Sequence, residues 1–372
     1  MAAVERQEAG QALGRPGVPV AEAAQLRRNL ARTGDRKQAM DQAVTIIITP
    51  RDRYTGLGEC VDAVYRHTPQ PFRLWIMDLD YPASVIEPVR RQLQGRPEVR
   101  FFDLGLRTPM DALREAQPLV DTAAVVLLDN DSRVTEGWLP PLLEAMADGH
   151  AVVTPLILER EGVDRGAPLR NHLYSGELRV VDVDGAPYLI EHKHFRRTEV
   201  PDLPKERAAT GTFELHCVLF DGDVFRRIEL PSMVIREHLD ISLQVAAMGR
   251  TMVVEPKSVI HFDNLGTRMA LPDMRFFFYR WGPKLTRPSS RLFQRRWGYN
   301  FYSEQSMYNW VVRRKAFLVS RWLGAPIGIA NRATQVAKKL FCRDWDPLPD
   351  PVAASRPLLA AGVPQQRSHE LG

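Results

Sequence analysis

The 372-residue sequence lacks any uninterrupted apolar run close to the roughly 18 residues that a membrane-spanning helix needs. Its first forty residues place arginines and a lysine among Ala, Gln and Gly, without the apolar stretch of a secretory signal. The three cysteines, Cys60, Cys217 and Cys342, are odd in number and far apart, which argues against a disulfide framework or a paired zinc motif. We therefore expect a cytoplasmic protein, either in solution or on the inner face of a membrane.

A glycine-rich phosphate loop is also missing, because no Gly-Lys-Ser/Thr follows Gly56 and Gly58. The composition is that of a globular protein, with 44% hydrophobic and 26% charged residues, which is enough to bury a sizeable core. We predict four regions along the chain: a flexible tail over 1–40, an α/β domain over 41–270, a basic aromatic helical region over 271–345 and a disordered tail over 346–372.

Positive charge is concentrated near the carboxyl terminus. Residues 273–343 contain 15 Lys and Arg and two acids, so this segment carries +13, while the whole chain carries +5 and the remainder therefore −8. The segment fits an amphipathic patch on anionic lipid or a polyanionic acceptor, a solvated face over a small helical core, or, as the weakest alternative, a nucleic-acid surface. For the lipid alternative, the residues of interest are Arg313, Arg314, Lys315, Trp297, Trp310, Phe317 and Trp322.

Strand and helix patterns alternate through the first part of the chain. Apolar, β-branched or aromatic runs predict strands at 44–48, 72–77, 99–102, 123–128 and 151–158. Helical patterns lie between them, at 56–66, 84–94, 110–117 and 139–148, and a further helix and strand are predicted at 239–248 and 251–254. The short loops are those of βαβ units, so we predict a mostly parallel, doubly wound, Rossmann-like sheet. An Asp-Gly pair at 184–185 predicts a hairpin turn.

Three predicted strands end in polar residues, where a doubly wound sheet binds its ligands. These ends are Thr49-Pro50-Arg51-Asp52, Asp78-Leu79-Asp80 and Asp129-Asn130-Asp131. Asp129 and Asp131, two residues apart after a buried strand, are suited to a hard divalent cation such as Mn²⁺ or Mg²⁺. Such a cation would share its coordination with phosphate oxygens and would neutralise charge on a departing nucleotide.

The order of these motifs resembles family 2 glycosyltransferases. The stretch 44–53 is similar to their first strand and loop, and 125–138 (VVLLDNDSRVTEGW) to their metal-binding strand. Residues 211–220 resemble the acceptor-side segment, which precedes an acidic motif at 236–243. The similarity covers about residues 43–265 and implies a GT-A fold and sugar transfer from a nucleotide diphosphate to an acceptor hydroxyl, with inversion.

The resemblance also implies roles for particular residues. Thr49, Pro50 and Arg53 would line the nucleotide-sugar site together with Asn130, and Asp78 would contact the base or ribose. Asp129 would lie near the ribose and the metal, and Asp131 would be the main metal ligand. A UDP-sugar is the first expectation for the donor, and no nucleic-acid partner is expected.

The acceptor hydroxyl must lose a proton as it attacks, so the site needs a base. The acidic motif offers Glu237 as our first candidate, His238 as the second, and Asp240 as a further acid at the start of a helix. The family usually has Asp where His238 stands, although Glu-His-x-Asp variants occur among GalNAc-transferase-like enzymes. Both Glu237 and His238 therefore stay candidates for the base.

Two other histidine positions could bind metal. His261 resembles the late histidine that many family members place beside the metal or pyrophosphate, and imidazole is a reasonable ligand for Mn²⁺. His192 and His194 lack further ligands at a zinc-like spacing, so we expect them in an exposed loop. The sequence also allows a nucleotidyltransferase or an inactive transferase-like scaffold as alternatives to an active glycosyltransferase.

Overall fold

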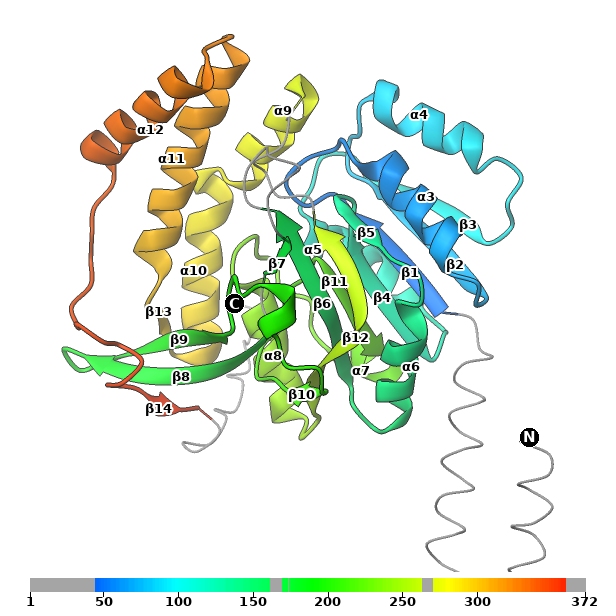
Figure 1. The fold of residues 1–372 in the computed structure, drawn as a ribbon, viewed down its shortest axis with the longest axis horizontal. Coiled ribbons are helices and arrows are strands. Elements are labelled where there is room, and N and C mark those ends of the chain that lie inside the picture. Colours follow the sequence, from blue (N-terminus) through cyan, green and yellow to red (C-terminus); the bar gives the residue numbers. More distant parts are fainter. Residues whose placement is uncertain (1–43, 161–168, 173, 263–269, 359–372) are drawn as a thin grey trace, which may run out of the picture.

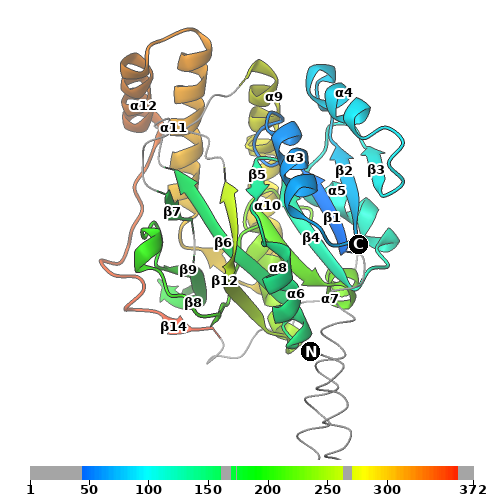
Figure 2. The ribbon, with the colours of Figure 1, turned by 45° about the vertical axis from the view of Figure 1, so that its right-hand side comes forward.

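The computed structural model describes residues 44–160, 169–172, 174–262 and 270–358, so the predicted tail over 1–40 lies outside the described part. Strand and helix alternate as the sequence predicts. The elements are β1 (Val44–Thr49), α3 (Leu57–His67), β2 (Phe72–Asp78), α4 (Ala83–Gln92), β3 (Val99–Asp103), α5 (Pro109–Ala116) and β4 (Ala124–Asp129). Figures 1 and 2 show α3 and α4 on one face of the sheet and α5 on the other. This is the arrangement of right-handed crossovers between parallel strands.

The main sheet is mixed. The strands β3, β2, β1 and β4 are parallel neighbours, and beyond them follow β11 (Cys217–Asp221), β6 (Val152–Arg160), β12 (Met252–Phe262) and β10 (Ala208–Ala209). β11 runs antiparallel to both β4 and β6, whereas β6 and β12 are parallel. The chain enters β11 at the carboxyl edge of β4, where Cys217 pairs with Leu128, and must therefore run back. The predicted parallel pairing holds for β3, β2, β1 and β4 and for the pair β6 and β12, while the antiparallel β11 makes the whole sheet mixed.

Apolar side chains from both faces of the main sheet form one large core. Every residue of β1 is buried, as expected for a strand that is covered on both sides. The amphipathic helix α3 packs Leu57, Val61 and Val64 against it. Its first turn follows Gly56, whose φ of +109° favours glycine and whose added Cβ would lie 3.1 Å from the Asn130 carbonyl. The loop after β1 thus lies directly against the Asp129-Asn130-Asp131 segment.

A smaller four-stranded sheet lies beside the main one (Figure 1). The predicted hairpin is confirmed: β8 (Ser175–Val183) and β9 (Ala186–His194) are joined at Asp184 and Gly185, which have φ of +52° and +78°. β13 (Asn300–Phe301) pairs with β9, and β14 (Arg356–Pro357) pairs with β8. Residues 346–358 therefore differ from the disordered tail that we expected, because backbone pairing and the buried Leu358 fix them in place.

The basic region forms four helices, α9 (Leu271–Arg280), α10 (Pro283–Trp297), α11 (Glu304–Trp322) and α12 (Ile327–Phe341). α9 is part of the main body, because Phe276 joins the main core and Asp273 accepts hydrogen bonds from the backbone N–H groups of Tyr54 and Thr55. A domain boundary near residue 270 stays a prediction, but the helices after it help to hold the loop that follows β1. Among the described residues, no helix is long and apolar enough to span a membrane.

The helix α8 (Glu237–Ala247) is anchored to α10 by Asp240, whose side chain is fully buried. Its carboxylate accepts a hydrogen bond from Trp297 Nε1 at 2.8 Å and lies 2.9 Å from Arg296 Nε. These contacts direct Asp240 toward α10. A catalytic role for Asp240 stays a prediction, and its surroundings support a structural one.

We expect Asp240→Ala to lower the free energy of unfolding by about 3 kcal/mol, because Arg296 would be left buried without this partner. Urea denaturation measures the change. Asp182→Ala is the control, since Asp182 forms an exposed ion pair with Arg356 and its loss should change stability little. Wild-type stability for Asp240→Ala combined with lost activity would instead indicate a catalytic carboxylate.

Candidate active site

The carboxyl ends of β1 and β4 meet the start of β11 at one edge of the main sheet. Asp129, the last residue of β4, pairs in register with Thr49 of β1, and its N–H donates to the carbonyl of His216. The side chains of Asp129, Asn130 and Asp131 are each at most 3% exposed. The acidic motif therefore lies where the sequence predicts, in a site that is largely closed to water.

Asp129, Asp131 and His216 form a candidate cation-binding group, with one possible ligand atom from each within 4.8 Å of the others. His216 Nδ1 lies 2.9 Å from Asp129 Oδ2. Both carboxylate oxygens of Asp131 are buried without a hydrogen-bond partner, and the nearest charged group is Arg53, with Nε 3.9 Å from Oδ2. Two carboxylates and an imidazole, one carboxylate lacking donors, are a set that suits Mn²⁺ or a related divalent ion.

The protonation of this group depends on its burial. Burial raises the pKa of Asp129 to about 7, although Arg51 and Arg280 oppose the rise. Burial and the neighbouring charge of Asp129 raise the pKa of Asp131 well above its usual range. Burial and the charge of His172 lower the pKa of His216, which keeps the imidazole neutral, as metal binding requires. A bound cation would favour the ionised form of both carboxylates.

Two arginines lie between the acidic groups. Arg51 Nη1 lies 2.7 Å from Glu237 Oε1, and Arg51 Nε lies 3.7 Å from Asp129 Oδ2. Arg280 of α9 donates to Asp52 and also lies 3.3 Å from Glu237 Oε1. Burial favours the neutral form of Glu237, but Arg51, Arg280 and the neighbouring His238 together hold its pKa below the usual range. Glu237 is thus an ionised carboxylate clamped by two cations.

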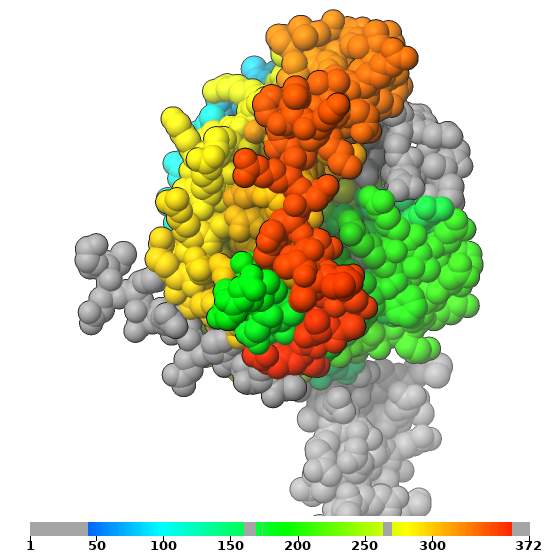
Figure 3. Space-filling view, turned by 90° about the vertical axis from the view of Figure 1, so that its left-hand side faces the viewer, coloured from blue at the N-terminus to red at the C-terminus, as the bar shows by residue number. Residues whose placement is uncertain are grey.

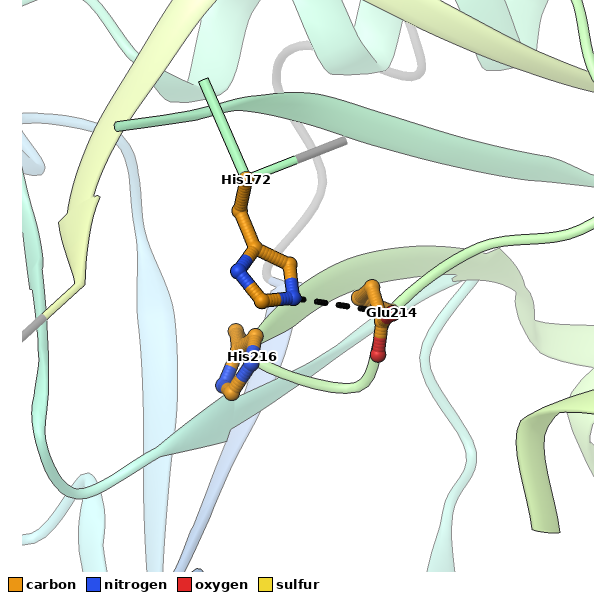
Figure 4. A group of neighbouring side chains, drawn as sticks. All are labelled: His172, Glu214 and His216. Atoms are coloured by element: carbon orange, nitrogen blue, oxygen red, sulfur yellow. Dashed lines mark ion pairs between the residues drawn. The ribbon is translucent and has the colours of Figure 1, made fainter. Parts of the chain in front are cut away.

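A second cluster of charged groups continues from His216. Figure 4 shows the His172 and His216 rings and the Glu214 carboxylate facing one another. His172 lies 3.3 Å from Glu159 and 3.6 Å from Glu214, and Glu214 also accepts from Lys193 at 2.6 Å. Burial opposes the charge on His172, but the two carboxylates raise its pKa to about 9. This imidazolium is neutralised by carboxylates on both sides, which favours a charge-balancing role over metal binding.

His238 faces the same site and approaches the carboxylate of Glu191. Neither ring nitrogen has a hydrogen-bond partner, and Nε2 lies 3.4 Å from Oε1 of Glu191. Glu191 is 4% exposed, and the charges of Lys193 and His238 lower its pKa to about 2 although burial opposes this. Arg236, just before α8, holds a left-handed φ of +60° and pairs with Glu191 at 3.1 Å. Such a conformation costs energy outside glycine and often occurs at functional sites.

Many of the groups described above line one cavity of 330 Å³, whereas Asp129 and Asp131 are not part of its lining. His216 from the cation-binding group, and Glu237 and His238 from α8, all line it, together with Arg280 and Trp281 of α9. A larger, mainly apolar cavity of 660 Å³ lies at the ends of β1 and β2, between Tyr54, Tyr81 and α9. The two cavities offer separate spaces for polar and aromatic ligand groups.

The polar groups of Asn130 and Asp78, two of the predicted site residues, are engaged in hydrogen bonds or ion pairs within the protein. Asn130 donates to the carbonyls of Arg53 and Tyr54 and accepts from the N–H of Arg51, so it fixes the loop after β1. Asp78 accepts from the Tyr81 N–H and pairs with Arg90. Thr49 and Pro50 are buried at the end of β1. Nucleotide-sugar contacts by these residues and by Arg53 stay predictions.

His261 lies on β12, in register with Arg133 of β5 (Ser132–Val134). Among the described residues, it belongs to none of the groups of three or more side chains that could share a cation, so its role as a ligand stays a prediction. The neighbouring Phe262 stacks on the His216 ring with centroids 3.8 Å apart. His192 and His194 lie half-buried on strand β9, not in the exposed loop that we expected, because they pair with β8.

Sequence reasoning missed His216, Glu191 and Arg280 as parts of the site. Glu214 and His216 stand two residues apart within the segment that carried the family resemblance, which puts both side chains on one side of an extended chain. Arg280 stands between Phe276-Phe277-Phe278-Tyr279 and Trp281, and an arginine within an aromatic run is a signal for a buried, paired cation. Glu191 carried no comparable signal.

The chain resembles known glycosyltransferases in both sequence and structure. A family model described as glycosyl transferase family 2 matches residues 45–210. The chain is similar to the solved structure of GalNAc-T7 with UDP, GalNAc and Mn²⁺, at 12% identity and a TM-score of 0.48, over 87% of this chain and 58% of that chain. It is also similar to the mannosyltransferase PcManGT from Pyrobaculum calidifontis in complex with GDP-Man and Mn²⁺, at 14% identity and a TM-score of 0.42, over 84% and 90% of the two chains. A comparison with curated proteins gave no match.

The family match runs from β1 to β10 and includes the strand that carries Asp129 and the following Asp131. It favours sugar transfer over the nucleotidyl transfer that the sequence left open. The curled mixed sheet, with the acidic motif at its carboxyl edge and helices at the carboxyl terminus, has the GT-A arrangement. Residues 45–210 of this chain thus match the glycosyl transferase family 2 model, within a fold that is GT-A-like.

Proposed function

We propose that the protein transfers a sugar from a nucleoside-diphosphate sugar to an acceptor hydroxyl in a divalent-cation-dependent reaction. The observation that carries this proposal is the group formed by Asp129, Asp131 and His216, of which His216 lines the cavity. The unpartnered, buried carboxylate of Asp131 supports cation binding there, since such a group is costly without a counterion. The ion would supply Lewis-acid stabilisation of the departing diphosphate.

We place the nucleobase in the apolar cavity at the ends of β1 and β2. Tyr54 lines this cavity and follows Arg53, whose guanidinium approaches Asp131. A base bound there would have an aromatic neighbour on one side and the cation-binding group on the other, which suits a nucleoside diphosphate. The base and the sugar are to be identified with a panel of nucleotide sugars by thermal shift, because a bound donor raises the melting temperature. A UDP-sugar is our first expectation.

We assign proton removal from the acceptor to His238, ahead of Glu237. Glu237 is held by two arginines, which makes it a weak base. His238 lines the cavity, and its Nε2 lies 3.4 Å from Oε1 of Glu191. A proton on Nε2 directed at Glu191 would leave Nδ1 as the acceptor for the hydroxyl proton, as in other carboxylate-imidazole pairs. His238 and His216 line the same cavity, which supports a single displacement with inversion, and NMR of the product anomer tests that outcome.

Asp131→Asn is expected to abolish Mn²⁺-dependent donor binding while the protein stays folded, because it removes a charged ligand and leaves the side-chain shape unchanged. Isothermal titration calorimetry with a UDP-sugar, with and without Mn²⁺, measures this. Asp121→Asn, at an exposed carboxylate that pairs with Arg73, is the matched control and should bind as the wild type does. Equal Mn²⁺-dependent affinity for Asp131→Asn and the wild type would contradict the cation site.

His238→Ala is expected to lower kcat by a factor on the order of 10² or more, with unchanged donor affinity, as for other lost general bases. Glu191→Gln should lower kcat less, since it removes only the group that orients the imidazole. Steady-state kinetics with a saturating acceptor, together with donor titration by calorimetry, separate the two quantities. If kcat falls strongly in Glu237→Gln and stays nearly normal in His238→Ala, Glu237 is the base and the assignment to His238 is wrong.

A further inference from the structure

The hairpin of helices α11 and α12 stands at one end of the molecule, beside α9 (Figures 1 and 3). The two helices pack along each other, but α12 buries only Ala330 and Ala337 in doing so. Its larger apolar side chains are therefore left on the surface of the described part of the chain. The most exposed ones are Ile327, Ile329, Val336, Leu340 and Phe341 on α12, and Trp322 and Leu323 at its approach.

These apolar side chains include a continuous stripe. Ile329, Val336 and Leu340 are spaced at i, i+7 and i+11, which places them on one side of a helix, and they are 55%, 56% and 67% exposed. Leu323, directly after α11, and Phe341, the last residue of α12, are 72% and 70% exposed. Scattered single apolar residues are ordinary on a protein surface, but a stripe of this length marks an interaction site.

The same surface is strongly basic. Residues 305–343 contain eight Lys and Arg and no acid. On α12, Arg332 and Lys339 follow Ile329 and Val336 by three residues each, so they border the apolar stripe, and both are exposed together with Lys338. An exposed apolar stripe bordered by cations is the pattern of a helix that lies in the boundary between lipid headgroups and acyl chains.

We propose that α12 docks this protein onto an anionic lipid surface. Charge decides between a membrane and a second copy of the chain as the occupant. In a two-fold dimer the face would meet itself and bring the same cations together, whereas an anionic bilayer neutralises them and also accepts the apolar stripe. This inference does not depend on sugar transfer, so it can fail or succeed independently of the proposed function.

Of the residues that the sequence suggested for lipid contact, Trp322 lies on this surface and is 56% exposed, whereas others are turned toward the protein. Lys315 donates to the carbonyl of Trp281, and burial lowers the pKa of Arg314 to about 10, so both side chains point toward the protein. Trp297 is 3% exposed and bonds to Asp240. The docking face is instead α12 with its preceding turn.

The test is co-sedimentation of the full chain with vesicles of phosphatidylcholine alone or with added phosphatidylglycerol, at low and high salt. We expect pelleting with phosphatidylglycerol at low salt only. Changing Arg332, Lys338 and Lys339 together to Gln should lower the partition coefficient on the order of 100-fold. Changing Ile329, Val336 and Leu340 together to Gln should lower it on the order of ten-fold or more.

The control variant carries Leu119→Gln and Phe195→Gln, at apolar residues that are 44% and 49% exposed elsewhere on the surface, and it should pellet as the wild type does. All substitutions are at exposed positions, and circular dichroism checks that the variants fold. No pelleting at low salt, or equal pelleting of the Ile329, Val336 and Leu340 variant, would overturn the proposal. If sedimentation velocity shows concentration-dependent dimers and the protein does not bind vesicles, the α12 face contacts a second copy of the chain. That result would also overturn the lipid proposal.

Discussion

Several carboxylates are buried at the carboxyl edge of the main sheet, and a buried carboxylate must either be paired with positive charge or be protonated. Asp129, Asp131 and Glu237 come from β4, the segment after it and α8, and all three are nearly inaccessible to water. The compensating cations, Arg51 and Arg280, come from the loop after β1 and from α9. The charge balance of this site therefore requires four separate parts of the chain to be in place together.

This requirement explains why α9, in the carboxyl-terminal region, contributes to the candidate site. Asp273 at the start of α9 holds the backbone of Tyr54 and Thr55, while Asn130 holds the same loop from the other side. At the end of α9, Arg280 reaches Glu237. An arginine network that neutralises acids in the free protein also provides positive charge near the place where a donor diphosphate would bind, so it serves both stability and substrate binding.

The sequence predicted the order of strands and helices, because buried parallel strands and amphipathic helices leave clear apolar periods. It also predicted that Asp129 and Asp131 would lie at a strand end. It did not predict which imidazole would accompany them, because that depends on side-chain direction at the end of β12. Neighbouring strand residues face opposite sides, and Phe262 is the one that stacks on His216. The partners of Arg280 and Asp240 could not be predicted for another reason, since each of these partners lies far away in sequence.

We propose Asp129, Asp131 and His216 as the ligands of the divalent cation that makes donor binding possible. Pulsed electron paramagnetic resonance of Mn²⁺ bound to the protein reports directly on a nitrogen ligand through its coupling to ¹⁴N. We expect a ¹⁴N coupling in the wild type that is lost in His216→Gln and retained in His261→Gln. Retention of the coupling in His216→Gln, or no tightly bound Mn²⁺ in the wild type, would contradict it.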